Sequence, residues 1–341
     1  MIDAGGADRE ARVTPRTGQA APPSRFAQFV LQRMLSRRPR RFRDRIVDAA
    51  WRRVRAAAVR LLGDPSIRYM FHGFELELPL SHDLPLLRRD HPGYATNLAR
   101  AASLVLDRYP DLHCIDVGAN AGDTAAMLRE SGRFPILCID GDPGYFEMLC
   151  RNVSGLDEVL CACALLGERD DWIGGALAAS RGSAQLASSG GTADLRVRSL
   201  DSLLAEYPTF RSAKLLKIDT DGHDLRILAG AARLLAESKP VLFFEFDPHW
   251  LRRAGDDPAR LRPMLREHGY RTVLAWDNFG DLLTTLDTGE PRGWEEACGY
   301  IEGREGLYYF DLCAFHPEDQ DLGARLRANE LARGASRGRE A

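Results

Sequence analysis

The residues best suited to ligand chemistry directly follow a short apolar run at 113–117. They form the pattern G-x-N-x-G-D and are Gly118, Asn120, Gly122 and Asp123. A strand, a glycine turn and a helix bring backbone N–H groups close to a ligand. Because Asp123 would repel a pyrophosphate at the helix start, the pattern favours a ligand with ammonium and sulfonium groups, such as S-adenosylmethionine (SAM). The simpler alternative is a helix cap beside two turn glycines.

Further acids lie within or at the ends of the apolar runs: Asp116, Asp140, Asp219 and Glu245. In an open parallel sheet, ligands bind beyond the carboxyl ends of the strands. Asp140 follows Asp116 by 24 residues. This spacing is close to the ~20-residue offset of an acid that binds ribose hydroxyls. We therefore expect Asp140 and its neighbour Gly141 in a cofactor site, with an ordinary turn acid as the alternative.

Four titratable residues follow or end the fourth and fifth apolar runs: Asp219, Asp221, His223 and Glu245. A reaction at a weakly acidic group needs close alignment and a base or a metal. By its intrinsic pKa, His223 is the strongest candidate base, and a solvent-facing residue at a helix start is the alternative. Asp219 with Asp221 or Glu245 offers oxygen ligands for a divalent cation. No spacing here is a metal signature, so we predict no metal site.

These residues need a scaffold, and the chain alternates apolar runs with helical patterns. The expected strands are 113–117, 134–140, 159–165, 214–219, 240–247, 271–276 and 307–315. The expected helices among them are 94–109, 142–152, 224–236 and 258–268. Such alternation predicts an α/β fold with a mostly parallel sheet and helices on both faces. Lys217, inside a buried strand, is expected to pair with one of the carboxylates.

The two ends of the chain differ from this central part. We expect four regions: a disordered segment at 1–40, an Arg-rich helix, hairpin and helix at 41–110, the SAM-binding domain at 111–316, and a charged tail at 317–341. Residues 33–60 contain eleven Arg and two Asp. The basic helix there is expected either to dock on the domain or to contact an anionic membrane or protein partner.

Composition limits the class of protein. The chain has 341 residues, 45% of them hydrophobic, and a net charge of −3, which argues against bulk binding of nucleic acid. Its seven cysteines are odd in number and show no C-x-x-C pattern, which predicts a reducing, cytoplasmic location. No apolar run approaches the ~18 residues of a membrane helix, and the first residues lack the apolar part of a secretory signal.

Several segments together resemble the FkbM family of SAM-dependent methyltransferases. They are Cys114–Thr124, Leu137–Pro143, Val197–Asp201, Lys217–Ala231 and Val241–Asp247. The resemblance spans about residues 67–316, and its K-I-D-x-x-G block is the most specific part. It implies a seven-stranded, Rossmann-like class I methyltransferase sheet with a reversed last strand. It also implies SAM as the methyl donor and O-methylation of a hydroxyl on a sugar, glycan or natural product.

The resemblance also implies roles for individual residues. Those expected at the methionine end of SAM are Asp116, Gly118, Asn120, Gly122 and Asp123. Asp140 stands where the family usually has a ribose-binding Glu. The chain departs from the common pattern at Asp221, where Glu is more frequent, and at Cys163, where many relatives have an Asn near adenine. We therefore expect adenine to be held around Ala164 and Leu165.

Two other functions remain open from the sequence. A catalytically silent interaction domain would keep the same fold and work through its basic helix. A nucleotide-cofactor oxidoreductase would use a similar sheet, but the missing third glycine and Asp123 disfavour it. The loops at 167–194 and 277–306 are expected to shape the pocket of the methyl acceptor. Four aromatic residues could stack on a sugar face or could instead be core and loop anchors: Trp276, Phe279, Trp294 and Tyr300.

Overall fold

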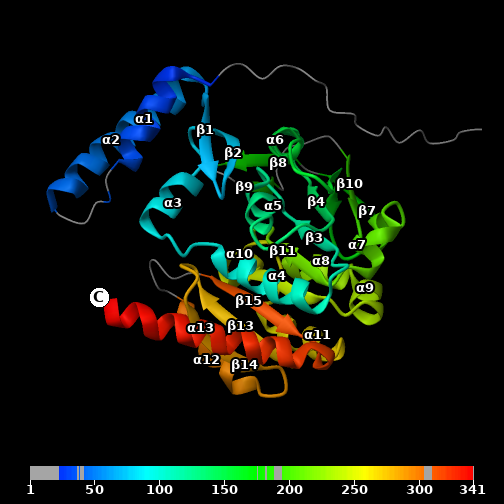
Figure 1. Ribbon diagram of the computed structural model, residues 1–341. Helices are drawn as coiled ribbons and strands as arrows, with labels where there is room; N and C mark the ends of the chain where they lie inside the picture. The colour runs from blue at the N-terminus through cyan, green and yellow to red at the C-terminus, as the bar shows by residue number, and fades with distance from the viewer. Residues whose placement is uncertain are drawn as a thin grey trace, which may run out of the picture.

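The computed structural model describes residues 23–36, 38, 42–174, 176–180, 183–187, 194–302 and 309–340. The part of the predicted disordered segment before residue 23 lies outside these residues. A large sheet with the strand order β14-β13-β15-β12-β11-β3-β4-β5 forms the centre of the molecule (Figure 1). Its strands are β3 (Cys114–Val117), β4 (Ile136–Asp140), β5 (Val159–Cys163), β11 (Leu215–Ile218), β12 (Val241–Phe246), β13 (Thr272–Asp277), β14 (Leu282–Asp287) and β15 (Phe310–Phe315).

The strand directions confirm the predicted mostly parallel sheet with a reversed last strand. β15 runs antiparallel to both of its neighbours, β12 and β13. The central strands β5, β4, β3, β11 and β12 are all parallel. The expected number of seven strands was too low, because β14 pairs antiparallel with the outer edge of β13. The strand order reverses between β3 and β11, which is where open α/β sheets bind ligands.

Alternating side chains of the strands divide the interior into two cores. Cys114, Cys138 and Leu215 point into one core, whereas their neighbours Ile115 and Leu216 point into the other. Both faces are apolar because both are covered by helices, which explains the continuous apolar runs in the sequence.

The helices form two layers around the sheet. The first core includes α4 (Thr96–Arg108), α5 (Asp123–Leu128), α6 (Pro143–Val153) and part of α13 (Gln320–Glu340). The second includes α7 (Leu200–Leu203), α8 (Asp224–Ala229), α9 (Ala232–Glu237), α10 (Pro248–Arg253), α11 (Leu261–Glu267) and α12 (Pro291–Ile301). Short 3-10 turns lie at η1 (Pro208–Ser212), η2 (Pro258–Arg260) and η3 (Pro317–Asp319). The single helix expected at 224–236 is interrupted around Gly230, giving α8 and α9.

The N-terminal region contains more structure than expected. The helix α1 (Arg25–Leu35) lies within the segment predicted to be disordered. It begins after Ser24, whose side chain caps the Ala27 N–H, and it buries Ala27, Val30, Leu31 and Met34. These positions recur at helical spacing. The prediction overlooked this apolar face because Arg and Gln residues lie between its members in the sequence.

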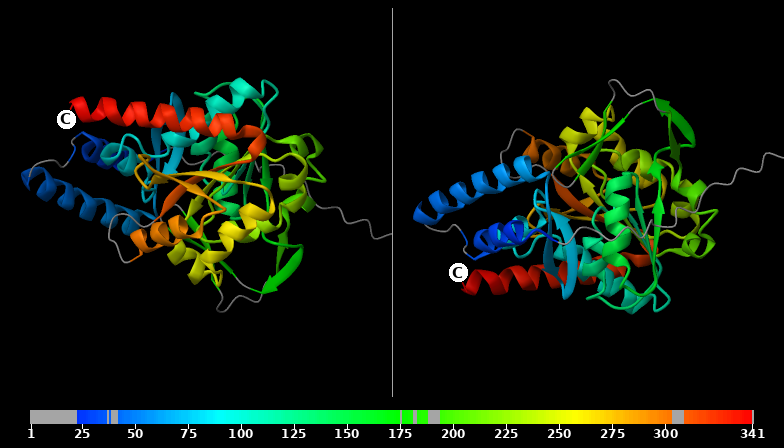
Figure 2. Two further views of the ribbon diagram at one scale, coloured as in Figure 1. Left: turned by 90° about the horizontal axis from the view of Figure 1, so that it is seen from below. Right: turned by 90° about the horizontal axis from the view of Figure 1, so that it is seen from above.

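The Arg-rich helix α2 (Phe42–Leu62) packs beside α1, and the pair projects from the body of the molecule (Figures 1 and 2). After it come the predicted hairpin of β1 (Ser66–Phe71) and β2 (Phe74–Pro79), and then α3 (Leu84–Asp90). Arg55 of α2 donates hydrogen bonds to the carbonyls of Leu80, Ser81 and His82. α2 therefore docks on the domain through one face.

The loop expected at 167–194 contains short strands. β6 (Leu165–Leu166), β7 (Asp171–Gly174) and β10 (Asp194–Arg198) form one small sheet, and β8 (Ala176–Ser180) and β9 (Ser183–Ala187) form another.

At the C-terminal end of the chain, α13 packs against α4 and β13 along much of the body, so the charged tail is a docked helix. Within the described ranges, no helix is both long and apolar enough to cross a bilayer.

Candidate functional site

The glycine turn after β3 lies flush against the end of β11. Gly118, Asn120 and Gly122 all have positive φ angles, of 72°, 48° and 83°. A Cβ atom on Gly118 would lie 1.8 Å from the backbone oxygen of Asp219. The absence of a side chain at Gly118 is therefore what lets β3 and β11 end side by side and leaves a cradle for a ligand.

Asp140, at the end of β4, holds this turn in place. One carboxylate oxygen accepts the backbone N–H of Asn120 at 2.8 Å, and the other accepts that of Asp142 at 2.9 Å. Burial raises the pKa of Asp140, and these two hydrogen bonds lower it. Each oxygen keeps a lone pair that could accept a further hydrogen bond, as a ribose hydroxyl would supply.

Two cavities adjoin the turn. The smaller one, of about 100 Å³, opens beside the Asp140 carboxylate. Six residues predicted for the cofactor site line it: Gly118, Asn120, Asp140, Gly141, Ala164 and Leu165. Ile139, Val197 and Ile227 add apolar wall. An acid next to an apolar slot matches the two ends of adenosine, a ribose with hydroxyl donors and a flat base. These residues therefore fit the adenosine part of SAM.

A larger cavity, of about 720 Å³, lies on the other side of the turn. Gly118, Asn120, Asp219 and Asp221 line both cavities. The other predicted residues that line the larger one are Asp123 and Glu245. The structure thus places Asp219 and Asp221 where the two cavities meet, and Glu245 in the larger cavity, where it interacts electrostatically with both.

Two residues predicted at the methionine end line neither cavity. Asp116 is fully buried and forms an ion pair of 2.9 Å with Lys217, its register partner on β11. Burial alone would lower the pKa of Lys217, but the charges of Asp116 and Asp219 raise it. The predicted pairing of Lys217 is confirmed, and Asp116 supports the turn from beneath. A Cβ atom on Gly122 would lie 2.7 Å from Val153, so this glycine permits packing against α6.

His223 lines the smaller cavity together with Asp219 and Asp221, but it does not line the larger cavity with Glu245. It precedes α8 and lines the smaller cavity, near Ile227. Burial, followed by the charge of Arg226, lowers the pKa of His223, which favours its neutral form. Its position corrects the expectation that it joins Glu245 as a base, because the turn before α8 directs it to the cofactor side.

Burial and mutual repulsion set the protonation of the acids. Burial, and then the charge of Asp219, raises the pKa of Glu245 well above its ordinary value. Asp311 is the register partner of Glu245 on β15, and its pKa is raised to about 7 by burial although Asn97 donates a 2.7 Å hydrogen bond to it. The pKa of Asp224 is likewise raised to about 7 by burial. A buried carboxylate of raised pKa is a stronger base than an exposed one.

Sequence reasoning missed the residues that the N-terminal region contributes to the larger cavity: His82, His91 and Tyr94. Nε2 of His82 lies 3.3 Å from the side-chain oxygen of Asn120, while Nδ1 accepts the N–H of Leu84. These contacts favour the tautomer that donates from Nε2 to Asn120. These residues precede the first strand of the sheet and are separated from it by α4, and no spacing in the sequence links them to β11 or β12.

The four aromatic candidates for stacking divide by position. Phe279 lines the larger cavity. Trp276 and Trp294 are buried in the cores, and Tyr300 lies on the exposed α12 outside both cavities. Among the described residues, no three His, Cys, Asp or Glu side chains are grouped so that they could hold a metal ion.

We expect Asp140→Ala to weaken SAM binding by about 1.5–3 kcal/mol, or roughly 10- to 150-fold, because hydrogen bonds to a charged acceptor are lost. Isothermal titration calorimetry measures this dissociation constant. Asp201→Ala is a matched control, since Asp201 also accepts two backbone N–H groups, from Arg233 and Leu234, but lines neither cavity. Unchanged affinity in a folded Asp140→Ala variant would remove Asp140 from the cofactor site.

Residues 116–272 match the Methyltransferase FkbM domain. Among solved structures, the methyltransferase FkbM of Methylobacillus flagellatus KT is 19% identical, with a TM-score of 0.34, and the match covers 46% of this chain and 37% of that one. Magnesium protoporphyrin IX methyltransferase of Synechocystis PCC 6803, with bound SAM, is 14% identical (TM-score 0.37; 68% and 83% covered). TYW2 of M. jannaschii, in complex with AdoMet, is 11% identical (TM-score 0.38; 74% and 86% covered). No curated protein matches the chain.

Proposed function

We propose that this chain, a SAM-dependent methyltransferase by its FkbM methyltransferase domain at residues 116–272, acts on a hydroxyl oxygen. The acceptor would be a sugar, a glycan or a natural product. The observation that carries the proposal is the junction of the two cavities at Asp219 and Asp221, with the half-buried Glu245 lining the larger one. A hydroxyl acceptor must lose a proton as it is methylated, and this junction supplies a strong carboxylate base.

The residues proposed to hold SAM surround the smaller cavity and the turn. Asp140 would accept the ribose hydroxyls, Gly141, Ala164 and Leu165 would enclose the adenine, and Gly118, Asn120 and Asp123 would face the methionine part. The Gly118 cradle and the remaining lone pairs of Asp140 support this assignment. When bound, SAM supplies an electrophilic methyl group.

The protein's own residues would then orient the acceptor and take up its proton. Asp219 and Asp221 lie where the cavities meet, so they would align the acceptor hydroxyl. Glu245 would accept the hydroxyl proton as the new O–CH₃ bond forms and the S–CH₃ bond breaks. The products are a methyl ether and S-adenosylhomocysteine (SAH). Correct alignment of the reacting atoms accounts for much of the rate acceleration in such displacements.

The lining of the larger cavity supports a hydroxyl-rich acceptor. It combines carboxylates, such as Asp219 and Glu245, with the aromatic rings of Tyr94, Trp250 and Phe279. Carboxylates accept hydrogen bonds from hydroxyl groups, and aromatic faces pack against the apolar C–H face of a sugar ring.

A single set of measurements tests this function. SAH release would be measured with methyl glycosides, UDP-hexoses, phenols and their amine counterparts, and mass spectrometry would locate the methyl group. We expect O-methylated products. Methylation only at nitrogen or carbon would overturn the proposal. Calorimetric binding of SAM without SAH release from any acceptor would favour the silent interaction domain, and binding of NADH alone would favour the oxidoreductase.

We further propose that the outer face of α2 contacts an anionic membrane surface and that the enzyme works in the cytoplasm. Phe42, Ile46 and Leu61 expose 77%, 56% and 79% of their surface on this helix, beside exposed Arg43 and Arg53. Arginine among exposed apolar side chains is typical of helices that lie on anionic lipid. All seven cysteines are free thiols, which supports a reducing compartment.

Ile46→Asp combined with Leu61→Asp should abolish sedimentation with phosphatidylserine vesicles, because both side chains would lose their apolar contact with lipid. The melting temperature should stay within about 2 °C, since exposed substitutions have small effects on stability. Leu283→Asp, at an exposed apolar residue on β14, is the control. Vesicle binding that survives in the double variant would exclude this helix as the contact.

A further inference from the structure

Two aromatic residues from distant parts of the chain stack inside the larger cavity. The rings of His91 and Phe279 have centroids 4.2 Å apart and planes 27° apart, and both residues line the cavity. His91 precedes α4 and Phe279 follows β13, so both lie outside residues 116–272. A stacked pair of rings presents a flat, weakly polar surface of the kind that binds the face of another ring.

We propose that His91 and Phe279 form a subsite for the sugar ring of the acceptor, and that Glu330 of the C-terminal helix positions this subsite through Arg100. The proposal rests on the proposed function, because it assumes that the acceptor occupies the larger cavity. It assigns a substrate-orienting role to segments that lie on both sides of the matched methyltransferase domain.

Hydrogen bonds from nearby side chains to backbone carbonyls hold the first segment of this subsite, residues 91–96. Arg88 donates to the carbonyls of Pro92 and Tyr94, at 2.7 and 2.8 Å. The hydroxyl of Thr96 donates to the carbonyl of Gly93 at 2.8 Å. These bonds fold residues 91–96 into a compact turn that directs His91 and Tyr94 to the cavity.

The second segment is a tight turn at 277–281. One carboxylate oxygen of Asp277 accepts the N–H groups of Phe279 and Asp281, both at 3.0 Å. Gly280 has a φ of 83°, and a Cβ atom there would lie 2.5 Å from the carbonyl oxygen of Gly93. The two turns therefore touch backbone to backbone, and this contact brings Phe279 onto His91.

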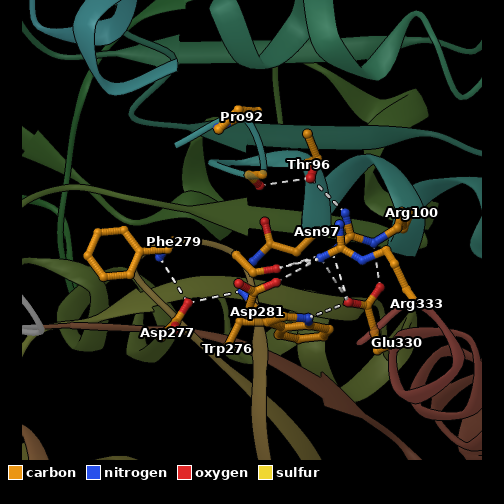
Figure 3. A network of polar contacts seen from close by, with 12 residues as sticks. Pro92, Thr96, Asn97, Arg100, Trp276, Asp277, Phe279, Asp281, Glu330 and Arg333 are labelled. Carbon is orange, nitrogen blue, oxygen red and sulfur yellow. Dashed lines mark hydrogen bonds and ion pairs between the residues drawn. The ribbon is translucent and has the colours of Figure 1, made fainter. Parts of the chain in front are cut away.

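A buried ion pair joins both turns to the C-terminal helix (Figure 3). Glu330 of α13, whose side chain is 1% exposed, pairs with Arg100 of α4 through two bonds, one of them 2.9 Å long, and accepts the indole N–H of Trp276 at 3.1 Å. Arg100 also donates to the hydroxyl of Thr96 at 2.6 Å. Arg333, one turn after Glu330, donates to the carbonyl of Gly280 at 2.9 Å.

This arrangement makes Glu330 a positioning residue. It has no place in the lining of either cavity, yet its partner Arg100 contacts the first turn and its neighbour Arg333 contacts the second. Removing one partner of a buried ion pair leaves the other charge uncompensated, which is strongly destabilising locally. Loss of the Glu330 charge should therefore loosen both turns while leaving the SAM site intact.

The test uses the full chain saturated with SAH, and methyl β-D-glucopyranoside as the probe. Its binding is measured by saturation-transfer NMR, and hydrogen exchange reports on the amides of 94–96 and 279–281. We expect Glu330→Gln to weaken the probe at least about fivefold and to speed exchange in both turns about tenfold, with SAM affinity unchanged within about twofold. Phe279→Leu should weaken the probe similarly without speeding exchange at 94–96.

Tyr109→Phe is the matched control, because the Tyr109 hydroxyl bonds Asp319 just before α13 without touching either turn. It should lower the melting temperature and leave probe binding unchanged. Three results would each overturn the inference. The first is equal probe binding in wild type and Phe279→Leu, and the second is unchanged hydrogen exchange in Glu330→Gln. The third is a wild type that binds phenol, used as an aromatic comparison ligand, but not the methyl glucoside. Probe binding without SAH release from any hydroxyl acceptor would instead refute the proposed function and leave the subsite standing.

Discussion

Gly118→Val is expected to abolish SAM binding, with a loss of affinity of at least about 100-fold, or roughly 3 kcal/mol. A Cβ atom at this position would lie 1.8 Å from the backbone oxygen of Asp219, and backbone atoms cannot move aside as a flexible side chain can. The valine would also be forced into a left-handed conformation, at a cost of about 1–2 kcal/mol. The turn must therefore shift away from β11, which disturbs both cavities.

Calorimetry with SAM and SAH measures this effect, and circular dichroism confirms that the variant is folded. Gly63→Val is the matched control, because Gly63 has a nearly identical φ of 70° but nothing within 4 Å of its Cβ position. It separates the cost of the left-handed conformation from the collision at the turn. Tight SAM binding by folded Gly118→Val would contradict the assignment of this turn to the cofactor.

The second large effect is expected for Glu245→Gln, which should lower kcat about 10²- to 10⁴-fold, the usual contribution of an enzyme base. Glutamine has the same shape but cannot accept the hydroxyl proton. The affinity for SAM should stay within a factor of a few, because Glu245 lines only the larger cavity. Steady-state rates with an accepted acceptor, together with calorimetry, separate these quantities.

The dependence of the rate on pH has a definite sign. A base must be deprotonated to act, so the rate should fall as the pH drops through the pKa of Glu245, which burial and Asp219 raise. Asp311 contributes to this raised pKa through its charge. Asp311→Asn should therefore shift the fall in rate to lower pH. A shift in the opposite direction would show that another group titrates.

The raised pKa of Glu245 limits what the pH profile can distinguish. A flat rate below about pH 6.5 would hold only for an acid with its ordinary pKa. Because the pKa of Glu245 is raised, the pH profile cannot distinguish it from a histidine, and the variants must do so. His223→Ala should weaken SAM and leave kcat at saturating SAM nearly unchanged, whereas Asp219→Asn should lower kcat. Full activity in Glu245→Gln and a large loss in His223→Ala would reverse the assignment.

Local pattern was enough to predict the central sheet and the turn that we propose for the cofactor. Apolar runs covered on both faces predicted the strands from Cys114–Val117 to Phe310–Phe315. β14 escaped detection because two Thr and a final Asp interrupt its apolar residues. Asp140 and the turn at Gly118 were also found, because a strand end and the turn after it lie next to each other in the sequence. Parallel strands then bring such ends to one edge of the sheet.

The partner of each buried charge depended on the tertiary structure. That Lys217 pairs with Asp116 follows from the register of β3 and β11, which are separated by about a hundred residues. The side to which His223 turns depends on how α8 starts. Neither register nor helix entry leaves a periodic signal in the sequence.

The larger cavity, which we propose for the acceptor, was determined almost entirely by folding. His91, Phe279 and Glu330 come from three segments that meet only when α4, β13 and α13 pack together. Sequence by itself therefore determined the sheet, the glycine turn and the acids at the strand ends, because these depend on short-range periodicity and on strand ends. Only the tertiary structure decided which distant side chains line the larger cavity, because contacts across long loops have no fixed spacing along the chain.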